Sequence, residues 1–249
     1  MPVQVELDPV SKEFEGADLG DKRLTRRLKR LADAAESAPG AGFPTQAGSD
    51  AALEGTYRFL NNPGVTPEAH LAPHVSQTVE RASAAEVVLV VHDTTSFQFD
   101  GDSQREGLGR IRGYGQGFIA HFALAVGADG SRKPLGVLGM RTHFRTEPPK
   151  GSEGWRDRLA RTDRESNRWL DLATVAGNHV AGRAEAVHVM DREGDSYELL
   201  AGLISGGHRF IIRLDHDRKL NTAAGKDSEM LRKLYATLAA LVGRPKRSR

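Results

Sequence analysis

Residues 86–99 read EVVLVVHDTTSFQF, an apolar run that ends in a histidine, an aspartate and two threonines. A continuous run of aliphatic residues is typical of a strand that is buried on both faces. Two further segments, FIAHFALAVGADG and PLGVLGMRTHF, have strand patterns, and the Asp129-Gly130 dipeptide that follows the first is a strong turn signal. Three successive strands are therefore expected across residues 86–144.

Helical and strand patterns alternate after this region. A helix is expected from about Asp163 to Gly182, followed by the strand AEAVHVMD, the helix SYELLAGLIS and the strand HRFIIRLD. This order predicts an α/β fold built on a mixed sheet with flanking helices. Its later strands should be parallel, because helical crossovers link them.

The first 82 residues have a different pattern and predict a small, all-helical, basic domain. Residues 11–36 carry leucines at helical spacing and are expected to form one helical segment. A Gly/Pro-rich turn follows, and Ser49 or Asp50 can cap a second helix that ends near residue 62. A third helix is expected over residues 67–85, because Thr66 is a good N-cap and proline is tolerated in the first turn.

Composition narrows the possible settings. The 249 residues include no cysteine, which excludes a disulfide framework and any thiolate metal site. The N-terminus lacks the basic-then-apolar layout of a signal peptide, and no apolar run approaches the roughly 20 residues that span a bilayer. We therefore expect a cytoplasmic protein with no membrane partner.

The basic residues are concentrated in the first helix, although the formal net charge is only +2. Six of the nine residues from Lys22 to Arg30 are lysine or arginine, and none is acidic. Guanidinium groups along a helix are suited to DNA phosphates, although a solvated helix face is the usual role of such a run. The predicted DNA-binding residues are Arg23, Arg26, Arg27, Arg30 and Arg58.

Arg58 belongs to the second helix of this domain. Leu53, Tyr57 and Leu60 share one stripe of that helix, which predicts that Tyr57 and Phe59 are core residues and that Arg58 points away from the core.

Two aspartates follow predicted buried strands, Asp93 after VVLVVH and Asp191 after AVHVM. Ligands and catalytic groups gather at the carboxyl ends of strands in open α/β sheets. If the two strands are neighbours, both carboxylates reach one place, and carboxylates with water suit Mg²⁺ or Mn²⁺. Asp93 and Asp191 are thus the predicted metal ligands and catalytic residues for phosphodiester chemistry. The alternative is that each aspartate only caps a turn.

Other polar residues near these aspartates have simpler explanations. His92 and His121 lie in strand-like surroundings and are expected to be packed or hydrogen-bonded, not metal ligands. Glu193 and Asp195 stand close to a predicted helix start, where acidic residues complement the helix dipole.

Several phrases occur together from about residue 13 to residue 220 and carry a resemblance to a known family. These phrases are LGDKRLTRRLKRLA, AALEGTYRFLNNPGVTPEA, HDTTSF, GFIAHFAL, ESNRWL and DREGDSYELL. In their order and spacing the chain resembles bacterial cut-and-paste transposases of the DDE class, of the insertion-sequence-four type that includes the Tn-five transposase.

The resemblance implies an N-terminal domain over residues 1–82 that binds double-stranded DNA at transposon ends. It also implies a ribonuclease-H-like catalytic domain, here incomplete, over residues 83–220. The first two family acids map to Asp93 and Asp191, with Mg²⁺ or Mn²⁺ as cofactor. The activity implied is metal-dependent nicking and strand transfer, carried out by two copies of the chain on DNA.

The chain departs from the family at the third acid, a Glu within a Tyr-x-x-Arg-x-x-x-Glu phrase. Here Glu229 precedes Tyr235, and residues 221–249 form a basic tail. We therefore expect a truncated form that is inactive or nearly so by itself.

Two other functions stay open at this point. One is a non-catalytic DNA-binding remnant that inhibits the intact transposase. The other is a stand-alone nuclease that completes its site with Glu193 or Asp195.

Overall fold

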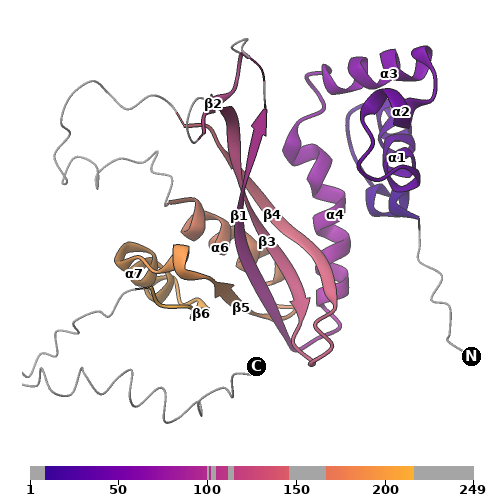
Figure 1. Ribbon diagram of the computed structural model, residues 1–249. Coiled ribbons are helices and arrows are strands. Elements are labelled where there is room, and N and C mark those ends of the chain that lie inside the picture. The colour runs from indigo at the N-terminus through magenta and orange to yellow at the C-terminus, as the bar shows by residue number, and fades with distance from the viewer. Residues whose placement is uncertain (1–8, 100, 102–104, 112–114, 146–166, 216–249) are drawn as a thin grey trace, which may run out of the picture. The chain divides into compact units, whose positions relative to one another are not determined.

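The computed structural model describes residues 9–99, 101, 105–111, 115–145 and 167–215. All regular elements between residues 9 and 82 are helical (Figure 1). These elements are η1 (Val10–Phe14), α1 (Lys22–Ser37), α2 (Phe43–Ala47), α3 (Asp50–Leu60) and α4 (Pro67–Ala82). Side chains cap three of these helices. Ser49 caps α3 and Thr66 caps α4, as the sequence indicates, and Asp21 caps α1.

The single helical segment predicted over residues 11–36 is wrong. The chain instead forms the short 3-10 helix η1 and then α1, with an irregular connection between them. Gly16 and Gly20 in that connection adopt positive φ angles of 83° and 76°, a backbone conformation that glycine tolerates and that ends a helix. The short helix α2 was also not predicted, because it lies in the Gly/Pro-rich stretch.

A small hydrophobic cluster holds η1, α1 and α3 together, with Ala17, Leu19, Leu28 and Phe59 at its centre. The prediction that Tyr57 is a core residue is wrong, because 48% of Tyr57 is exposed whereas only 2% of Phe59 is. The stripe of α3 that turns inward is the one with Thr56 and Phe59. The Thr56 hydroxyl tolerates burial because it donates to the Ala52 carbonyl at 2.9 Å.

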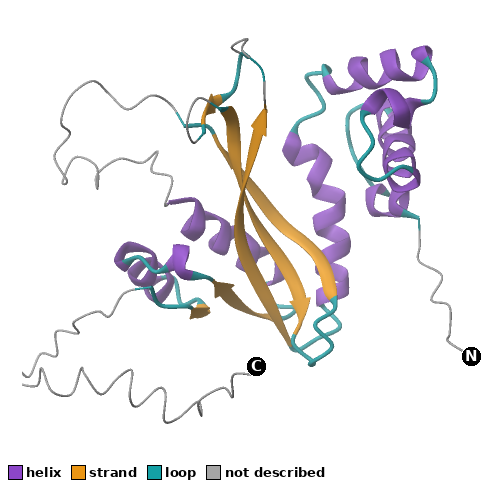
Figure 2. Cartoon of the chain, viewed as in Figure 1, coloured by secondary structure: helices purple, strands orange, loops and turns teal. Residues whose placement is uncertain are grey.

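The rest of the described chain forms a mixed sheet with helices (Figure 2). Its elements are β1 (Val87–Phe99), β2 (Gly109–Arg110), β3 (Gln116–Gly127), β4 (Pro134–His143), α6 (Asn167–Val180), β5 (Glu185–Met190), η2 (Arg192–Gly194), α7 (Tyr197–Ser205) and β6 (Arg209–Ile212). The strand order is β2-β3-β1-β5-β6, and β4 also pairs with β3. β1 pairs with β3 in antiparallel fashion, and both the β1–β5 and β5–β6 pairs are parallel. The predicted mixed sheet with parallel later strands is confirmed.

The two faces of the sheet differ in burial. Along β1, Val88, Val90 and His92 are buried, whereas the residues between them are only half-buried. Successive side chains of a strand point to opposite faces, so the buried set defines one face. That face packs against α4 and α6 through a cluster that includes Val79 and Leu172.

α4 therefore shares its core with the sheet, since Val75, Val79 and Ala82 belong to the same cluster as Val88 and Val90. The predicted domain boundary at residue 82 stays a prediction. α4 packs against the sheet through Val75, Val79 and Ala82, and its Ala69 packs against the cluster of η1, α1 and α3. The predicted tail over residues 221–249 and the start of the helix expected from residue 163 lie outside the described residues.

A polar cluster links η1 to α4 and β4. The Glu13 carboxylate accepts two hydrogen bonds from the Arg81 guanidinium, at 2.7 and 3.0 Å, and lies 2.8 Å from His74 Nδ1. His74 Nε2 accepts a hydrogen bond from the Val137 backbone N–H at 2.9 Å, which leaves Nδ1 as the donor to Glu13. Burial opposes ionisation of Glu13, but the hydrogen bonds from Arg81 and His74 and the charge of Arg81 outweigh it and lower the pKa of Glu13.

Replacing Glu13 with glutamine should destabilise the fold, because Glu13→Gln removes the charge that this cluster is built around. Hydrogen bonds to charged groups are worth about 1.5–3 kcal/mol, so we expect a loss of about 2 kcal/mol in the free energy of unfolding at pH 7. Urea unfolding monitored by circular dichroism measures it. Glu54→Gln is the matched control, because Glu54 pairs with Arg58 on the exposed surface of α3 and should change stability by under about 0.5 kcal/mol. Equal effects of the two substitutions would contradict the prediction.

Candidate active site and nucleic-acid interface

The basic residues of α1 fall into two groups. Arg26 and Arg30 are exposed and, with Lys22 and Lys29, line a shallow hollow beside the helix. Arg27 is half-buried against α3, where a Cβ on Gly55 would lie 2.6 Å from its guanidinium. The hollow is therefore a cationic surface of the kind that DNA phosphates neutralise.

Two of the predicted DNA-binding arginines have acidic partners. Arg23 forms an ion pair with the α1 cap Asp21 at 2.9 Å, and Arg58 pairs with Glu54 at 3.3 Å. Both arginines stay exposed, but part of each charge is already compensated. No acidic residue occurs from Lys22 to Arg30, but Asp21, which directly precedes this run, pairs with its first arginine, Arg23.

The two predicted catalytic aspartates belong to neighbouring strands. Asp93 lies within β1, which continues to Phe99, so the expectation that it follows the end of a strand is wrong, whereas Asp191 directly follows β5. The parallel register of β1 and β5 ends at the pair Val91 and Val189, and Asp93 and Asp191 each stand two residues further along. By strand alternation both lie on the face opposite His92, and neighbouring strands are about 4.8 Å apart. Both aspartates are exposed.

Each of these aspartates also has a local structural role. One oxygen of Asp93 accepts the Thr94 backbone N–H at 2.8 Å, and one oxygen of Asp191 accepts that of Glu193 at 2.9 Å, which caps η2. The first bond holds the Asp93 carboxylate within β1, and the second holds the Asp191 carboxylate in the turn after β5. Two exposed carboxylates fit a hard cation such as Mg²⁺. Within the described part of the chain, no group of three or more histidine, aspartate or glutamate side chains is arranged to hold a metal.

Arg168, at the start of α6, is a residue of this region that the sequence analysis missed. Its side chain is only 11% exposed, and its guanidinium lies over the Trp169 ring. Nη2 is 3.5 Å from the Thr94 hydroxyl and 3.8 Å from the Glu193 carboxylate. A buried cation thus lies between Thr94 of β1 and the turn that follows β5, where it offsets the charge of Glu193. Its signal in the sequence was the phrase ESNRWL, which otherwise reads as an ordinary helix start.

Three buried histidines lie behind the aspartates. His92 Nδ1 is 3.3 Å from His121 Nε2, and His92 Nε2 is 2.9 Å from His188 Nδ1. The prediction that His92 and His121 are packed and hydrogen-bonded is confirmed. His188 was not predicted, although it occupies a buried position of AVHVM.

Burial lowers the pKa of all three imidazoles. The pKa of His92 falls to about 2, with further lowering by His188 and His121. The pKa of His121 falls to about 4; Arg168 adds to the shift and a hydrogen bond to the Asp93 backbone opposes it. The pKa of His188 also falls to about 4, with a smaller contribution from His208. The three rings are therefore neutral near pH 7.

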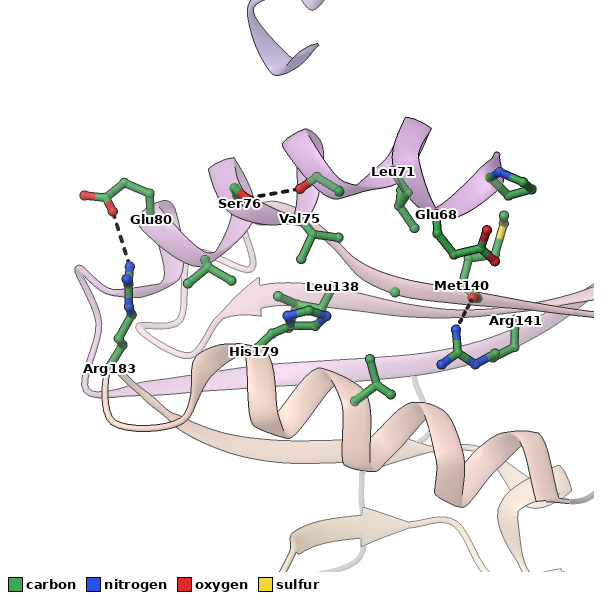
Figure 3. A pocket seen from close by; sticks show the side chains of 15 residues that line it. Glu68, Leu71, Val75, Ser76, Glu80, Leu138, Met140, Arg141, His179 and Arg183 are labelled. Atoms are coloured by element: carbon green, nitrogen blue, oxygen red, sulfur yellow. Dashed lines mark hydrogen bonds and ion pairs between the residues drawn. The ribbon is translucent and has the colours of Figure 1, made fainter. Parts of the chain in front are cut away.

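A groove of about 670 Å³ lies between α4 and α6 over β4 (Figure 3). Leu71, Val75 and Leu138 provide much of its apolar lining, and the ion pair of Glu80 with Arg183, at 3.5 Å, stands at one end (Figure 3). None of the candidate site residues lines this groove. The groove is therefore separate from the candidate site.

A comparison with known protein families adds to this geometry. Residues 9–65 match the transposase DNA-binding family. The matched segment contains the cationic surface of α1 and ends before α4. The match supports a transposase role with DNA as the partner. Among the residues that the structure describes, no helix combines the length and apolarity needed to cross a membrane.

Acid should destabilise the fold through the buried histidines. Their pKa values are lower in the folded chain than the ordinary 6.5 of the unfolded one, so the unfolded chain binds more protons below pH 6.5. Stability is then complete above that pH and falls as the pH drops towards 4. Between pH 7 and 5.5 the free energy of unfolding should fall by about 1 kcal/mol per histidine, measured by urea unfolding. An unchanged value would mean that the rings are not buried as neutral groups.

Proposed function

We propose that the chain is a form of DNA transposase of the DDE class, of the insertion-sequence-four type that includes the Tn-five transposase, and that it is nearly inactive by itself because its described residues supply no third catalytic acid. The observation that carries this proposal is the pairing of β1, which contains Asp93, with β5, which Asp191 follows. The same chain holds a segment that matches the transposase DNA-binding family. A DNA-binding surface and a pair of neighbouring carboxylates are two of the parts that transposition chemistry needs.

The sheet supports the ribonuclease-H-like fold that the resemblance implies. The strands β1, β3 and β4 form an antiparallel meander, and β5 and β6 follow in parallel with helices between them. Asp191 then stands at the carboxyl end of β5, the usual place for catalytic groups in sheets of this class, and Asp93 lies within the adjacent strand β1.

Asp93 and Asp191 would hold Mg²⁺ or Mn²⁺, which stabilises the attacking and leaving oxygens of phosphodiester cleavage. The residues of the chain contribute orientation: a backbone hydrogen bond within β1 holds the Asp93 carboxylate, the turn after β5 holds that of Asp191, and Arg168 adds a buried positive charge beside Thr94. The reaction proposed is hydrolytic nicking at a transposon end, followed by attack of the freed 3′-hydroxyl on target DNA, with two copies of the chain pairing the ends.

A second candidate is a non-catalytic DNA-binding protein that blocks an intact transposase. It is favoured by the fact that the residues described here supply two carboxylates and no third metal ligand beside them. Glu193 lies near Arg168 instead, which also weakens the stand-alone nuclease as an alternative. A nicking assay with Mn²⁺ on DNA that carries transposon ends separates the two candidates, with Asp191→Ala as the inactive reference.

DNA binding should depend on the cationic hollow of α1. Replacing both Arg26 and Arg30 with alanine should flatten the dependence of log Kd on log salt concentration by about one unit per lost phosphate contact. Fluorescence anisotropy with labelled duplex DNA over a range of salt concentrations measures this slope. Arg23→Ala is the matched control, because Asp21 already compensates that charge, and it should change the slope less. The assignment fails if the double variant keeps the wild-type slope.

Metal binding should require both aspartates. The wild-type chain should bind Mn²⁺ weakly, because two carboxylates leave the ion held mostly by water. Asp93→Asn and Asp191→Asn should each abolish binding in isothermal titration calorimetry. Asp129→Asn is the control, since Asp129 bonds Ser131 in the turn after β3. If Asp93→Asn bound Mn²⁺ with the same affinity as the wild type, Asp93 would have only a local structural role.

A further inference from the structure

Four phenylalanine rings gather at the end of the sheet where β1 finishes and β2 lies (Figure 1). Phe97 of β1 and Phe118 of β3 are directly opposite one another, and their rings stack with centroids 4.8 Å apart and planes 19° apart. Phe99 and Phe144 contact the same central ring, with centroids 6.2 and 5.6 Å from that of Phe118. The four rings therefore form one continuous aromatic surface, which we call the phenylalanine platform.

The platform is open to solvent. Phe97, Phe99 and Phe144 are between 37% and 45% exposed. Every residue of β1 from Thr95 to Phe99 is also exposed, so packing in the core of the sheet does not explain these side chains. Single exposed apolar residues are common on protein surfaces, whereas a contiguous group of large apolar side chains marks an interaction site.

The platform shares a face of the sheet with the candidate site. Asp93, Thr95, Phe97 and Phe99 are alternate residues of β1, and the pairing of β1 with β3 keeps one register throughout. Alternate side chains of a strand lie on the same face, so Phe97 lies about 13 Å along the strand from Asp93. A ligand that reaches the carboxylate can therefore also contact the rings.

Exposed aromatic rings on neighbouring strands suit unpaired nucleobases. RNA-recognition modules stack two or three bases on aromatic side chains of a sheet, and proteins that hold single-stranded DNA combine such stacking with nearby cations. The Arg105 guanidinium supplies a cation here, 5.5 Å from the centre of the Phe99 ring. Bases inside a duplex are covered by their neighbours, so only an unpaired or unstacked base can use the platform.

DNA is the nucleic acid that the rest of the chain favours. Residues 9–65 match the transposase DNA-binding family, and the carboxylates on the same face suit phosphodiester chemistry. Stacked nucleotides of one DNA strand are about 3.4 Å apart, so the distance from Asp93 to Phe97 corresponds to about four nucleotides. A strand with its phosphate at Asp93 would thus bring bases to the rings a few nucleotides away.

We propose that the phenylalanine platform binds the unpaired bases of single-stranded DNA, which stack on Phe97, Phe99 and Phe144 beside the candidate active site. The position of these bases relative to a cleaved phosphate rests on the transposase function proposed above, whereas stacking on the rings does not. The platform binds with little regard to sequence, because every base offers an aromatic face.

Binding of labelled oligothymidine to the full-length chain without metal, measured by fluorescence anisotropy, tests the platform. Replacing both Phe97 and Phe99 with leucine keeps apolar bulk but removes two aromatic faces, and should weaken binding by about tenfold. Replacing both with tyrosine should keep the wild-type affinity. Tyr197→Leu is the matched control, because Tyr197 is an exposed aromatic residue of α7 outside the platform, and it should leave the Kd unchanged.

Salt dependence and duplex binding separate base stacking from phosphate contacts. The leucine double variant should keep the wild-type slope of log Kd against log salt concentration, because the substitutions remove no cation. It should also bind blunt duplex DNA like the wild type. Wild-type affinity of this variant for oligothymidine would overturn the proposal, and so would an equal loss of affinity for the blunt duplex.

Photocrosslinking maps the contact on the wild-type chain and does not depend on how any variant folds. Oligothymidine that carries one 5-iododeoxyuridine is irradiated with the full-length chain, and the crosslinked residue is identified by mass spectrometry. Crosslinks should fall on Phe97, Phe99 or Phe144. Crosslinks confined to residues 9–65 would mean that the DNA-binding segment alone holds the strand, which would overturn the proposal.

A second copy of the chain is the other occupant to exclude. If light scattering shows a wild-type dimer and a monomeric leucine double variant with unchanged affinity for oligothymidine, the rings form a contact between copies and the proposal fails. Failure of the proposed function is a distinct result: a chain that neither binds Mn²⁺ nor nicks DNA should still bind oligothymidine through the rings. Unfolding curves of the leucine and tyrosine variants should overlay that of the wild type, which excludes loss of fold as the cause of weaker binding.

Discussion

The parallel pairing of β1 with β5 is the constraint on which the candidate site depends. These strands are nearly a hundred residues apart in the sequence, and the crossover between them includes α6, which packs on the buried face of the sheet. The pairing sets Asp93 beside Asp191 on one face and His92 beside His188 on the other. A one-residue shift in register would exchange the faces of every side chain on a strand, so the hydrophobic burial of Val88 and Val90 also fixes where the carboxylates lie.

The helical region is attached to this sheet by two different kinds of contact. α4 contributes apolar side chains to the sheet core, whereas η1, α1 and α3 have a small core of their own around Leu28 and Phe59. Glu13 connects the two by bonding Arg81 and His74 of α4. The segment that matches the transposase DNA-binding family thus keeps its cationic surface on α1, outside both cores.

Acidic side chains and neutral imidazoles lie on opposite faces of the sheet near Asp93. The exposed carboxylates of Asp93 and Asp191 lie on the solvent-facing side, and the imidazoles of His92, His121 and His188 are buried on the other. Burying charged rings would be costly, so the histidines remain neutral and bond one another. Arg168 lies near Thr94 and Glu193. Its largely buried guanidinium places positive charge close to the Glu193 carboxylate.

The sequence by itself determined most of the helices and strands, the mixed α/β class, the caps Ser49 and Thr66, and the apolar strand segments that precede Asp93 and Asp191. These features depend on local periodicity and on residues next to one another in the chain, as does the ion pair of Asp21 with Arg23. Only the tertiary structure decided that Phe59 is buried whereas Tyr57 is not, and that Arg168 and His188 join the site. Each of those outcomes depends on which element packs against which. The same helix or strand pattern is compatible with several partners until long-range burial of apolar surface selects one of them.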